Sequence, residues 1–328
     1  MQHTSLGRTG LKVSRLCLGT MTFGVQADEL AAHAILDKAA DGGITFIDTA
    51  DVYPIGRVAP GTTEEIIGKW LKDRRSDFIV ATKCFAPMSG RPWDSGNSRK
   101  HIMDAIDASL RRLQTDYVDL YQLHFYDQST PIDETLRALD DLVRSGKVRY
   151  IGCSNFLAYQ LARAVGRSEA LNLVRFESVQ PRYNLLFREI ERELLPLCAE
   201  DKIGVIPYNP IAGGLLSGKH SPESPEEGSR FTFGAGAGER YRDRYWHEGM
   251  FGTVEQLKPL ADQAGMTLAQ MAVAWLLANP VITAPIVGAS RPEQLDETLQ
   301  AAEKPLDPDL KERLDEITAK YRRGDTLR

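Results

Sequence analysis

The sequence lacks the features that mark membrane and secreted proteins. None of its apolar runs approaches the roughly 20 residues that a helix needs to span a bilayer. The first eight residues, MQHTSLGR, contain no apolar stretch of the kind found in a signal peptide. Its only cysteines (Cys17, Cys84, Cys153 and Cys198) are scattered without CxxC spacing, so we expect buried free thiols and no metal site. These absences predict a cytoplasmic protein with no membrane partner.

An excess of positive charge is also missing. The net charge of −5 gives no reason to expect binding to nucleic acid or to an anionic membrane. No strand-like segment is followed by GxGxxG, which counts against a Rossmann sheet. Apolar residues make up 42% of the 328 residues, enough for a large core, and no linker divides the chain into comparable halves. We therefore predict one domain over residues 1–328, and the sequence leaves open whether it forms a homo-oligomer.

Strand-like and helix-like segments alternate along the chain. The apolar, β-rich runs lie near residues 13–19, 44–48, 78–83, 117–123, 147–153, 176–180, 203–207 and 282–287. The helix-like stretches lie near residues 28–41, 62–73, 99–114, 132–145, 156–166, 189–201, 254–279 and 292–303. Eight strands alternating with helices predict an α/β fold, a (β/α)8 TIM barrel. Residues 307–320 have helical spacing and predict an extra C-terminal helix, whereas residues 86–98 and 220–252 read as long irregular loops.

Four polar residues fall at or just beyond the C-terminal ends of predicted strands. Asp48, Lys83 and His124 each end an apolar run, and Tyr53 follows Asp48 by five residues. Each residue alone is better explained by a structural ion pair or hydrogen bond. Together they lie on the face of a parallel barrel where active sites occur, so we interpret them as a catalytic group.

The chemistry of this group suits the reduction of a carbonyl. An isolated phenol has a pKa of about 10, and an ammonium nearby lowers the pKa of a phenol. We expect Lys83 to act in this way on Tyr53, Asp48 to hold Lys83 in place, and His124 to hydrogen-bond a substrate oxygen. Such general acid catalysis contributes about 10²–10⁴-fold to a rate.

The segments around these residues resemble the aldo-keto reductase family. They read GTMTFG (19–24), GGITFIDTADVY (42–53), SLRRLQTDYVDLY (109–121) and GCSNF (152–156), and the resemblance extends from about residue 4 to residue 303. It implies a barrel closed at its bottom by an N-terminal β-hairpin. It also implies an extended nicotinamide cofactor at the barrel top, NADPH/NADP+ in preference to NADH. By this resemblance Tyr53 is the general acid, Asp48 and Lys83 tune it, and His124 orients the carbonyl.

The same resemblance implies a strip of cofactor-binding residues. The early positions are Gly19, Thr20, Met21 and Asp48. Amide and hydroxyl groups for the nicotinamide carboxamide come from Ser154, Asn155 and Gln180, and Tyr208 stacks on the nicotinamide ring. The diphosphate is approached by a glycine-containing loop and a cation, namely Asn209, Pro210, Ile211, Ala212, Gly213, Gly218 and Lys219.

The eighth predicted strand leads into a site for the adenosine end. Gly288, Ser290 and Arg291 stand before a helix, a place suited to the 2′-phosphate of NADPH, and Gln294 matches the position beside the adenine. Thr298 stands where the family usually has asparagine, and Arg230 is a further candidate phosphate contact. We predict tighter binding of NADPH than of NADH, and equal affinities in a fluorescence titration would contradict this.

The predicted substrate pocket is lined by aromatic residues and the catalytic group. Its members are Phe23, Tyr53, Phe85, Trp93, His124 and Phe125. This mixture suits a small-molecule carbonyl substrate: a sugar aldehyde, a ketosugar or an aromatic aldehyde. Arg57 and Arg91 are candidates for an anionic substrate, although exposed loop arginine is the commoner explanation. Neither the substrate nor the direction of the reaction follows from the sequence.

A regulatory protein is the alternative function. Potassium-channel β subunits resemble this family, retain the four catalytic residues and act as cofactor-sensing partners of membrane proteins. We expect no docking segment ahead of the barrel in this sequence, which favours the enzyme. A single-turnover assay separates the two functions, because a pure regulator would oxidise bound NADPH negligibly with every carbonyl.

Overall fold

A computed structural model describes residues 1–55, 58–234 and 236–322, so that Arg57 lies outside the described residues. Eight parallel strands form one sheet in the order β10-β3-β4-β5-β6-β7-β8-β9. Their bounds are β3 Cys17–Gly19, β4 Phe46–Asp48, β5 Ile79–Cys84, β6 Val118–Leu123, β7 Val148–Ser154, β8 Phe176–Gln180, β9 Gly204–Val205 and β10 Ile286–Gly288. The sequence order of the strands is kept around the sheet, as expected when each strand is followed by a crossover helix.

The two outer strands of this sheet meet and close the barrel. The backbone N–H of Thr283 donates to the carbonyl of Val205 at 2.8 Å, and that of Ile286 donates to the carbonyl of Pro207 at 2.8 Å. These bonds join β9 to the segment that enters β10. The predicted (β/α)8 barrel is therefore confirmed.

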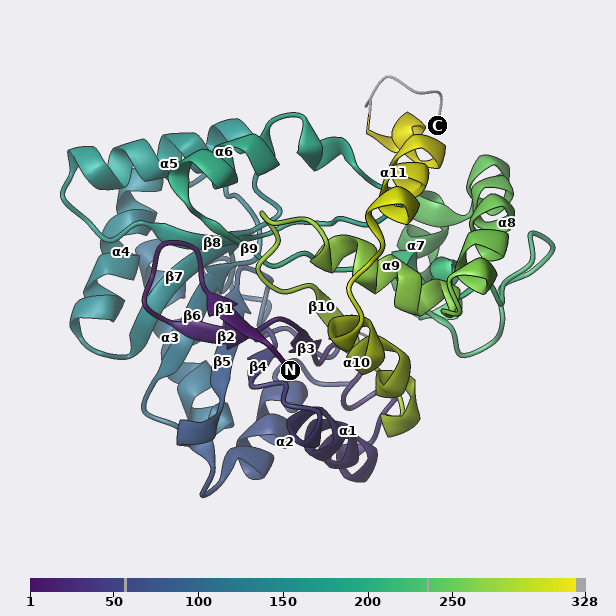
Figure 1. Cartoon of the computed structure of the whole chain (residues 1–328). Helices are drawn as coiled ribbons and strands as arrows, with labels where there is room; N and C mark the ends of the chain where they lie inside the picture. Colours follow the sequence, from purple (N-terminus) through teal and green to yellow (C-terminus); the bar gives the residue numbers. More distant parts are fainter. Residues whose placement is uncertain (56–57, 235, 323–328) are drawn as a thin grey trace.

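An N-terminal hairpin covers the end of the barrel where the strands begin (Figure 1). It consists of β1 (His3–Ser5) and β2 (Lys12–Ser14), which pair antiparallel. Its turn fits tightly: at Gly7, where φ is +56°, an added Cβ would lie 2.6 Å from the carbonyl oxygen of Lys202. The single strand predicted near 13–19 is wrong. It divides into β2 and β3, because the Ser14 hydroxyl donates to the carbonyl of Leu16 and turns the chain.

Helices surround the barrel. They are α1 Glu29–Asp41, α2 Thr62–Leu71, α3 Arg99–Leu113, α4 Ile132–Arg144, α5 Ala158–Ala170, α6 Leu194–Asp201, α7 Ala237–Tyr245, α8 Glu248–Gln263, α9 Leu268–Leu277, α10 Leu295–Glu303 and α11 Pro308–Ile317. They form where the apolar residues follow a helical period, as in α4, which buries Ile132, Leu136 and Leu139 on one face. Helix α11, the predicted C-terminal helix, packs outside the barrel through Leu314.

Two predicted segments differ from the structure. The helix predicted near 254–279 is two helices, because Gly265 takes a φ of +61° and the Thr267 side chain caps the start of α9. The loop predicted over 220–252 contains α7 and the first turn of α8, together with the 3-10 turn Arg230–Thr232. Helix α7 is stabilised by burying Tyr241 and Tyr245 against the barrel. The loop predicted over 86–98 has no helix or strand, as expected.

The core has two parts. Inside the barrel, Cys17, Phe46 and Leu120 pack with Leu6 and Val13 of the hairpin region. A larger cluster fills the space between the strands and the helices. All four cysteines are buried and free, as predicted. Among the described residues, no helix combines the length and the apolar character needed to cross a bilayer.

Candidate active site

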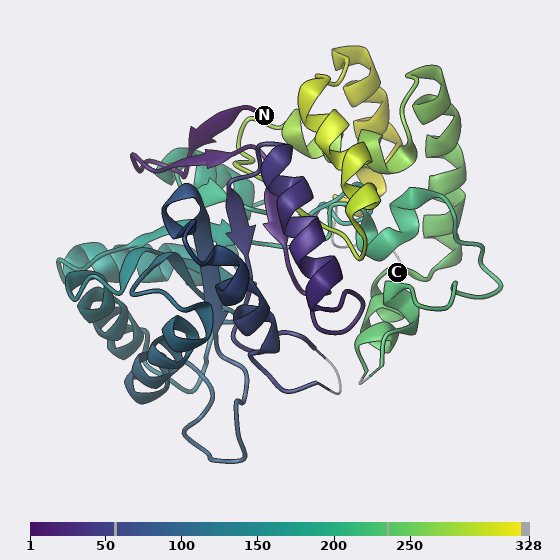
Figure 2. The same cartoon turned by 90° about the horizontal axis from the view of Figure 1, so that it is seen from below.

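The base of the site is a buried ion pair between neighbouring strands. Asp48 is the last residue of β4 and Lys83 lies near the end of β5. The Lys83 Nζ lies 2.5 Å from Asp48 Oδ2 and donates to the Thr49 carbonyl at 2.7 Å. Their side chains are only 0% and 4% exposed, so each charge depends on the other for its stabilisation. The N-terminal hairpin, which Figure 2 shows in purple at one edge of the molecule, meets the barrel strands where they begin, as at Gly7 beside Gly204.

Two glutamines complete the surroundings of Asp48. The second carboxylate oxygen accepts from Gln122 Nε2 at 3.0 Å and from Gln180 Nε2 at 2.8 Å. Gln180 was predicted from the sequence to bind a nicotinamide carboxamide, but its amide nitrogen is directed at Asp48. Gln122 was missed. The available signal was a polar residue within the apolar run of β6, where a buried amide requires a partner.

Tyr53 and His124 stand beside this ion pair. The Lys83 Nζ lies 5.4 Å from the centroid of the Tyr53 ring. The rings of Tyr53 and His124 meet edge to face with their centroids 6.0 Å apart. Phe125 stacks on His124 at 5.1 Å. The structure thus brings together all four residues that the sequence selected.

The pKa of Tyr53 is raised rather than lowered. Burial is the main cause, the negative charge of Asp48 adds to it, and the positive charge of Arg230 opposes it. The predicted lowering by Lys83 is therefore wrong for this structure. Its physical reason is burial, which disfavours the charged phenolate, together with the negative charge of the neighbouring Asp48. Tyr53 consequently holds its proton throughout the physiological pH range.

His124 is neutral at physiological pH. Burial, and then the positive charge of Lys83, lower its pKa to about 3. Its Nδ1 is buried, and it has no hydrogen-bond partner among the described residues. A neutral imidazole can donate one hydrogen bond from a ring nitrogen without adding charge to the site.

Residues at the C-terminal ends of β7 and β8, together with Tyr208 beyond β9, form a connected polar chain. Tyr208 donates from its hydroxyl to Asn155 Oδ1 at 2.8 Å. Asn155 Nδ2 donates to the His124 carbonyl at 3.0 Å and to Ser154 Oγ at 3.0 Å. The Ser154 hydroxyl in turn donates to the Gln180 carbonyl at 2.8 Å. Four predicted nicotinamide-binding residues are therefore held in one network next to His124.

The predicted diphosphate loop has a backbone that depends on glycine. It follows β9, and the 3-10 segment Ala212–Ser217 lies within it. Gly213 and Gly214 have φ values of +69° and +112°, which glycine adopts without strain, and the Gly214 amide donates to the Ile211 carbonyl at 2.9 Å. Asn209 Nδ2 is buried and has no hydrogen-bond partner among the described residues. Lys219 pairs with Glu226 at 2.9 Å, and both side chains are more than half exposed, so this pair is weak.

Residues from distant parts of the chain meet beside this loop. Arg230 Nη1 lies 3.5 Å from Met21 Sδ, and a Cβ added to Gly288 would lie 3.9 Å from Arg230 Nη2. Ser290 donates from its backbone N–H to Gln294 Oε1 at 2.8 Å. The structure thus gathers the predicted contacts for the adenosine phosphate on one side of the barrel top.

Three of the residues predicted to bind the cofactor already make close contacts or hydrogen bonds within the protein. Gly19 ends β3, where an added Cβ would lie 2.5 Å from the side chain of Ile286. The Thr20 hydroxyl donates to the Asp48 carbonyl at 3.0 Å. The Thr298 hydroxyl donates to the carbonyl of Leu295, and the residue is 8% exposed, so this hydroxyl is committed to its own helix.

The aromatic residues of the predicted substrate pocket divide into two groups. Phe23 is 0% exposed and belongs to the core, so its predicted place on the pocket wall is wrong. Phe85 and Phe125 pack with their centroids 5.5 Å apart. Phe125, which also stacks on His124, is 42% exposed and lies at the rim of the site, whereas Trp93 is 49% exposed within the loop 86–98.

Comparisons with known proteins decide the family of this chain. The sequence pattern of the "Aldo/keto reductase family" matches residues 15–319. The chain belongs to the aldo/keto reductase family. It is 42% identical over 325 residues to an uncharacterised oxidoreductase, YrpG, of Bacillus subtilis (strain 168), which covers 97% of this chain and 96% of the relative.

Other relatives of this aldo/keto reductase have named activities or partners. It is 40% identical to a probable voltage-gated potassium channel subunit beta of Arabidopsis thaliana, over 92% of both chains. It is 34% identical to the versiconal hemiacetal acetate reductase of Aspergillus parasiticus, over 94% of both chains. Membership of the family implies oxidoreductase activity, and the family generally uses nicotinamide cofactors.

The residues at the barrel top fit such a cofactor. The unpartnered Asn209 Nδ2, at the start of the glycine-containing loop, suits a diphosphate oxygen. Arg230 adds a guanidinium within the same region. Each of these features is a donor or a positive charge, which matches the acceptor oxygens of a dinucleotide.

Proposed function

We propose that this aldo/keto reductase reduces an aldehyde or ketone to the alcohol, with NADPH as the cofactor and Tyr53 as the general acid. The observation that carries the proposal is the buried Lys83–Asp48 pair, 2.5 Å long, beside a protonated phenol and a neutral imidazole. A donor phenol and a second neutral donor suit a carbonyl oxygen that becomes negative during reduction. The family and its named reductase support the same reaction class.

His124 and Tyr53 have different roles at the carbonyl oxygen of the substrate. The neutral His124 donates a hydrogen bond that orients the carbonyl, and its low pKa keeps it in the same form at all physiological pH values. A bound reduced nicotinamide supplies the hydride. The Tyr53 hydroxyl gives its proton to the oxygen, which is favourable even from a phenol of raised pKa because an alkoxide is the stronger base. The ammonium of Lys83 then stabilises the phenolate.

The cofactor is held by the strip described above. Ser154, Asn155 and Tyr208 face the nicotinamide end, and the loop around Gly213 holds the diphosphate. Arg230 and the exposed Arg291 favour NADPH over NADH, because guanidinium groups recognise a phosphate by charge and by paired hydrogen bonds. Gln294 flanks the adenine. The location we propose for the protein is the cytoplasm.

The substrate is a small carbonyl compound that enters past an aromatic rim. Phe85, Trp93 and Phe125 provide apolar contact area next to His124. Such a rim fits an aromatic aldehyde or the apolar face of a sugar. The catalytic residues serve reduction and alcohol oxidation equally.

Substitution of Tyr53 by phenylalanine tests the proposal. NADPH consumption is measured with a panel of aldehydes, ketones and oxidised sugars, together with the affinity for NADPH. We expect Tyr53→Phe to keep the cofactor affinity and to lose about 10²–10⁴-fold in kcat, since only the acidic proton is removed. An undiminished kcat would reject Tyr53 as the acid.

A second candidate function is that of a cofactor-binding regulatory subunit. The similarity to the plant protein named as a potassium channel subunit favours it. Mixing the NADPH-loaded protein with each carbonyl in a single-turnover experiment separates the two functions. Rapid oxidation of the bound NADPH supports the reductase, whereas negligible oxidation with every compound supports the regulator.

A further inference from the structure

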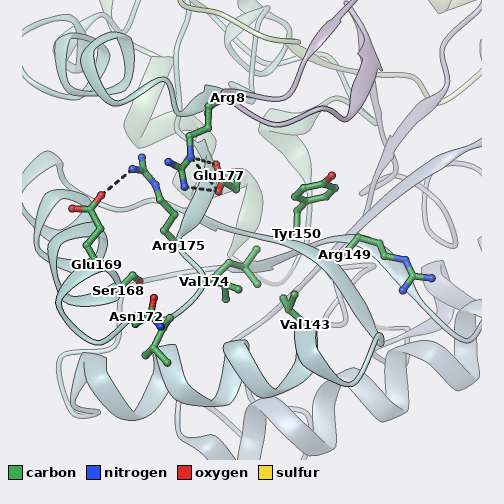
Figure 3. A pocket seen from close by; sticks show the side chains of 12 residues that line it. Arg8, Val143, Arg149, Tyr150, Ser168, Glu169, Asn172, Val174, Arg175 and Glu177 are labelled. Carbon is green, nitrogen blue, oxygen red and sulfur yellow. Dashed lines mark hydrogen bonds and ion pairs between the residues drawn. The ribbon is translucent and has the colours of Figure 1, made fainter.

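A cavity of about 520 Å³ lies where β7 and β8 begin, at the end of the barrel away from the catalytic residues (Figure 3). Arg8 at its edge lies 3.2 Å from Glu177. Arg175 in its wall lies 3.2 Å from Glu169. These pairs balance each other's charge, so the cavity gives no reason to expect a charged ligand. A connection with a consequence for function lies instead at the catalytic end.

Asn97 links two of the loops that follow neighbouring strands. It directly precedes Ser98, whose side chain caps the start of α3, so it lies near the end of the β5–α3 loop. Asn97 is 2% exposed, and its Nδ2 donates to the carbonyl of Phe125 at 2.9 Å. Phe125 is the second residue beyond β6. A buried side-chain amide therefore joins the β5–α3 loop to the segment that leaves β6.

The backbone of Asn97 is fixed from two further sides. Its N–H donates to Asp127 Oδ2 at 2.8 Å, and its carbonyl accepts from the Thr135 hydroxyl of α4 at 2.8 Å. The residue before it, Gly96, has a φ of +82°, and a Cβ added there would lie 2.7 Å from Asp127 Oδ2. The loop thus approaches Asp127 closely only because this position is glycine. The amide of Asn97 reaches Phe125 from a firmly held base.

The main chain beyond β6 is held by two asparagine side chains. The carbonyl of His124 accepts from Asn155 Nδ2 at 3.0 Å, and the carbonyl of the next residue, Phe125, accepts from Asn97. Asn155 follows β7 and Asn97 follows β5, which are the two neighbours of β6 in the sheet. The two amides therefore fix consecutive peptide groups from opposite sides.

The ring that this segment carries lies against the residue proposed to orient the carbonyl. Phe125 stacks on the imidazole of His124 with the ring planes 15° apart and the centroids 5.1 Å apart. It also packs on Phe85. Because Phe125 is still 42% exposed, part of its surface remains open to a ligand. Apolar contact area beside a polar donor is characteristic of small-molecule sites.

We propose that Asn97 is a positioning residue for substrate binding, which sets the place of the Phe125 ring beside the carbonyl compound. The proposal rests on the proposed reductase function, because the ring acts on a substrate only if a carbonyl is bound at His124. Asn97 is buried, so it acts through the main chain of Phe125 and does not touch the substrate. Without its amide, the Phe125 carbonyl loses its donor and the ring loses its fixed position.

A double-mutant cycle in steady-state kinetics tests the proposal on the full chain. The variants are Asn97→Ala, Phe125→Ala and their combination, and the substrate is the carbonyl of the panel that the unaltered protein reduces with the highest kcat/KM. We expect Asn97→Ala to raise KM about three- to tenfold with little change in kcat, as for the loss of uniform binding. In the Phe125→Ala background the same change should add no further rise in KM, since no ring is left to position.

Urea denaturation of the same proteins separates positioning from a general weakening of the fold. The carbonyl of residue 125 remains in Phe125→Ala, so Asn97→Ala should lower the stability equally in both backgrounds although it raises KM in only one. Asp119→Ala is the matched control. Asp119 lies at the other end of β6, where it accepts from the Val80 N–H at 2.9 Å and pairs with Arg75 at 2.7 Å. Its loss should lower the stability and leave KM unchanged.

Distinct results would overturn the proposal. An unchanged KM in Asn97→Ala, or an equal rise of KM in both backgrounds, would show that Asn97 does not act through the Phe125 ring. A rise of KM in Asp119→Ala as large as that in Asn97→Ala would reduce the effect to lost stability. An unaltered protein that reduces no carbonyl would refute the reductase function and this role together, whereas an active protein with an unchanged KM in Asn97→Ala would refute this role alone.

Discussion

Single side chains at the barrel top carry chemistry that depends on burial. The ammonium of Lys83 has two acceptors, and the carboxylate of Asp48 has three donors, all inside the barrel. In such a place a charge is tolerated only while its partners remain. The same burial, rather than the nearby ammonium, determines that the pKa of Tyr53 is raised.

The Lys83–Asp48 pair is predicted to be strongly coupled. Lys83→Met leaves the carboxylate of Asp48 buried without its cation and is expected to lower the free energy of unfolding by about 3–5 kcal/mol. Adding Asp48→Asn removes the unpaired charge, so the double variant is expected to be less destabilised than the sum of the single variants. Urea denaturation of the four proteins measures this, and simple additivity would contradict it.

His124 is predicted to make the stability of the protein depend on pH. Its pKa is about 3 in the folded protein and 6.5 in the unfolded chain, so between these values the unfolded state binds more protons. The stabilisation is therefore complete above pH 6.5 and is lost as the pH falls toward 3. Urea denaturation at about pH 7 and about pH 5 should show a smaller loss for His124→Gln than for the unaltered protein. Equal losses would show that His124 is not held neutral.

Among the elements, close contacts between neighbouring helices fix where the strand ends lie. Helix α2 crosses α3 at Gly68, where an added Cβ would collide with the carbonyl oxygen of Arg112. The same pair of helices is joined by Arg112 and the buried Glu64, 2.7 Å apart. Because α2 follows the loop that carries Tyr53, this contact positions the proposed acid.

Gly68→Ala is predicted to destabilise the fold by about 1–3 kcal/mol, because the new methyl group must push two backbones apart. Gly166→Ala in α5 is the matched control. That glycine is exposed, nothing lies within 4 Å of an added Cβ, and the change should stabilise the protein by about 0.5–1 kcal/mol. Thermal or urea unfolding measures both, and equal effects would contradict the proposed helix contact.

At the scale of the whole molecule, the barrel depends on a short seam. Strand β9 has two residues, and the seam is reinforced by Arg15, which lies between the hairpin and β3. Its guanidinium donates to the carbonyls of Ile282, Thr283 and Leu277, the last two at 2.9 and 2.8 Å. One side chain thus joins the segment between β2 and β3 to the end of α9 and to the segment that leads into β10.

Arg15→Met is predicted to lower the free energy of unfolding by about 1.5–3 kcal/mol, since carbonyls at the seam lose a charged donor. Arg99→Met is the control. Arg99 pairs with Asp141 at 2.6 Å, both side chains are about half exposed, and its loss should cost less than about 1 kcal/mol. Similar losses in the two variants, measured by urea denaturation, would show that Arg15 does not hold the seam.

The sequence alone determined the barrel and selected the four residues that we propose as catalytic. Strand-like runs repeat with helices between them, and this period survives in the fold because each run is buried on both sides. Asp48, Lys83 and His124 were found because the end of a strand is a local property that a pattern reports. The deviations at Gly265 and within residues 220–252 arose where a single positive φ or two buried tyrosines altered the local structure.

Only the tertiary structure decided how these residues act on one another. The glutamines around Asp48, the burial of Phe23 and the raised pKa of Tyr53 depend on distances between strands that lie far apart in the sequence. The cavity around Arg175 likewise joins the hairpin turn, two strands and two helices. A sequence pattern gives the type and order of side chains, whereas electrostatics and desolvation depend on which of them share a space that excludes water.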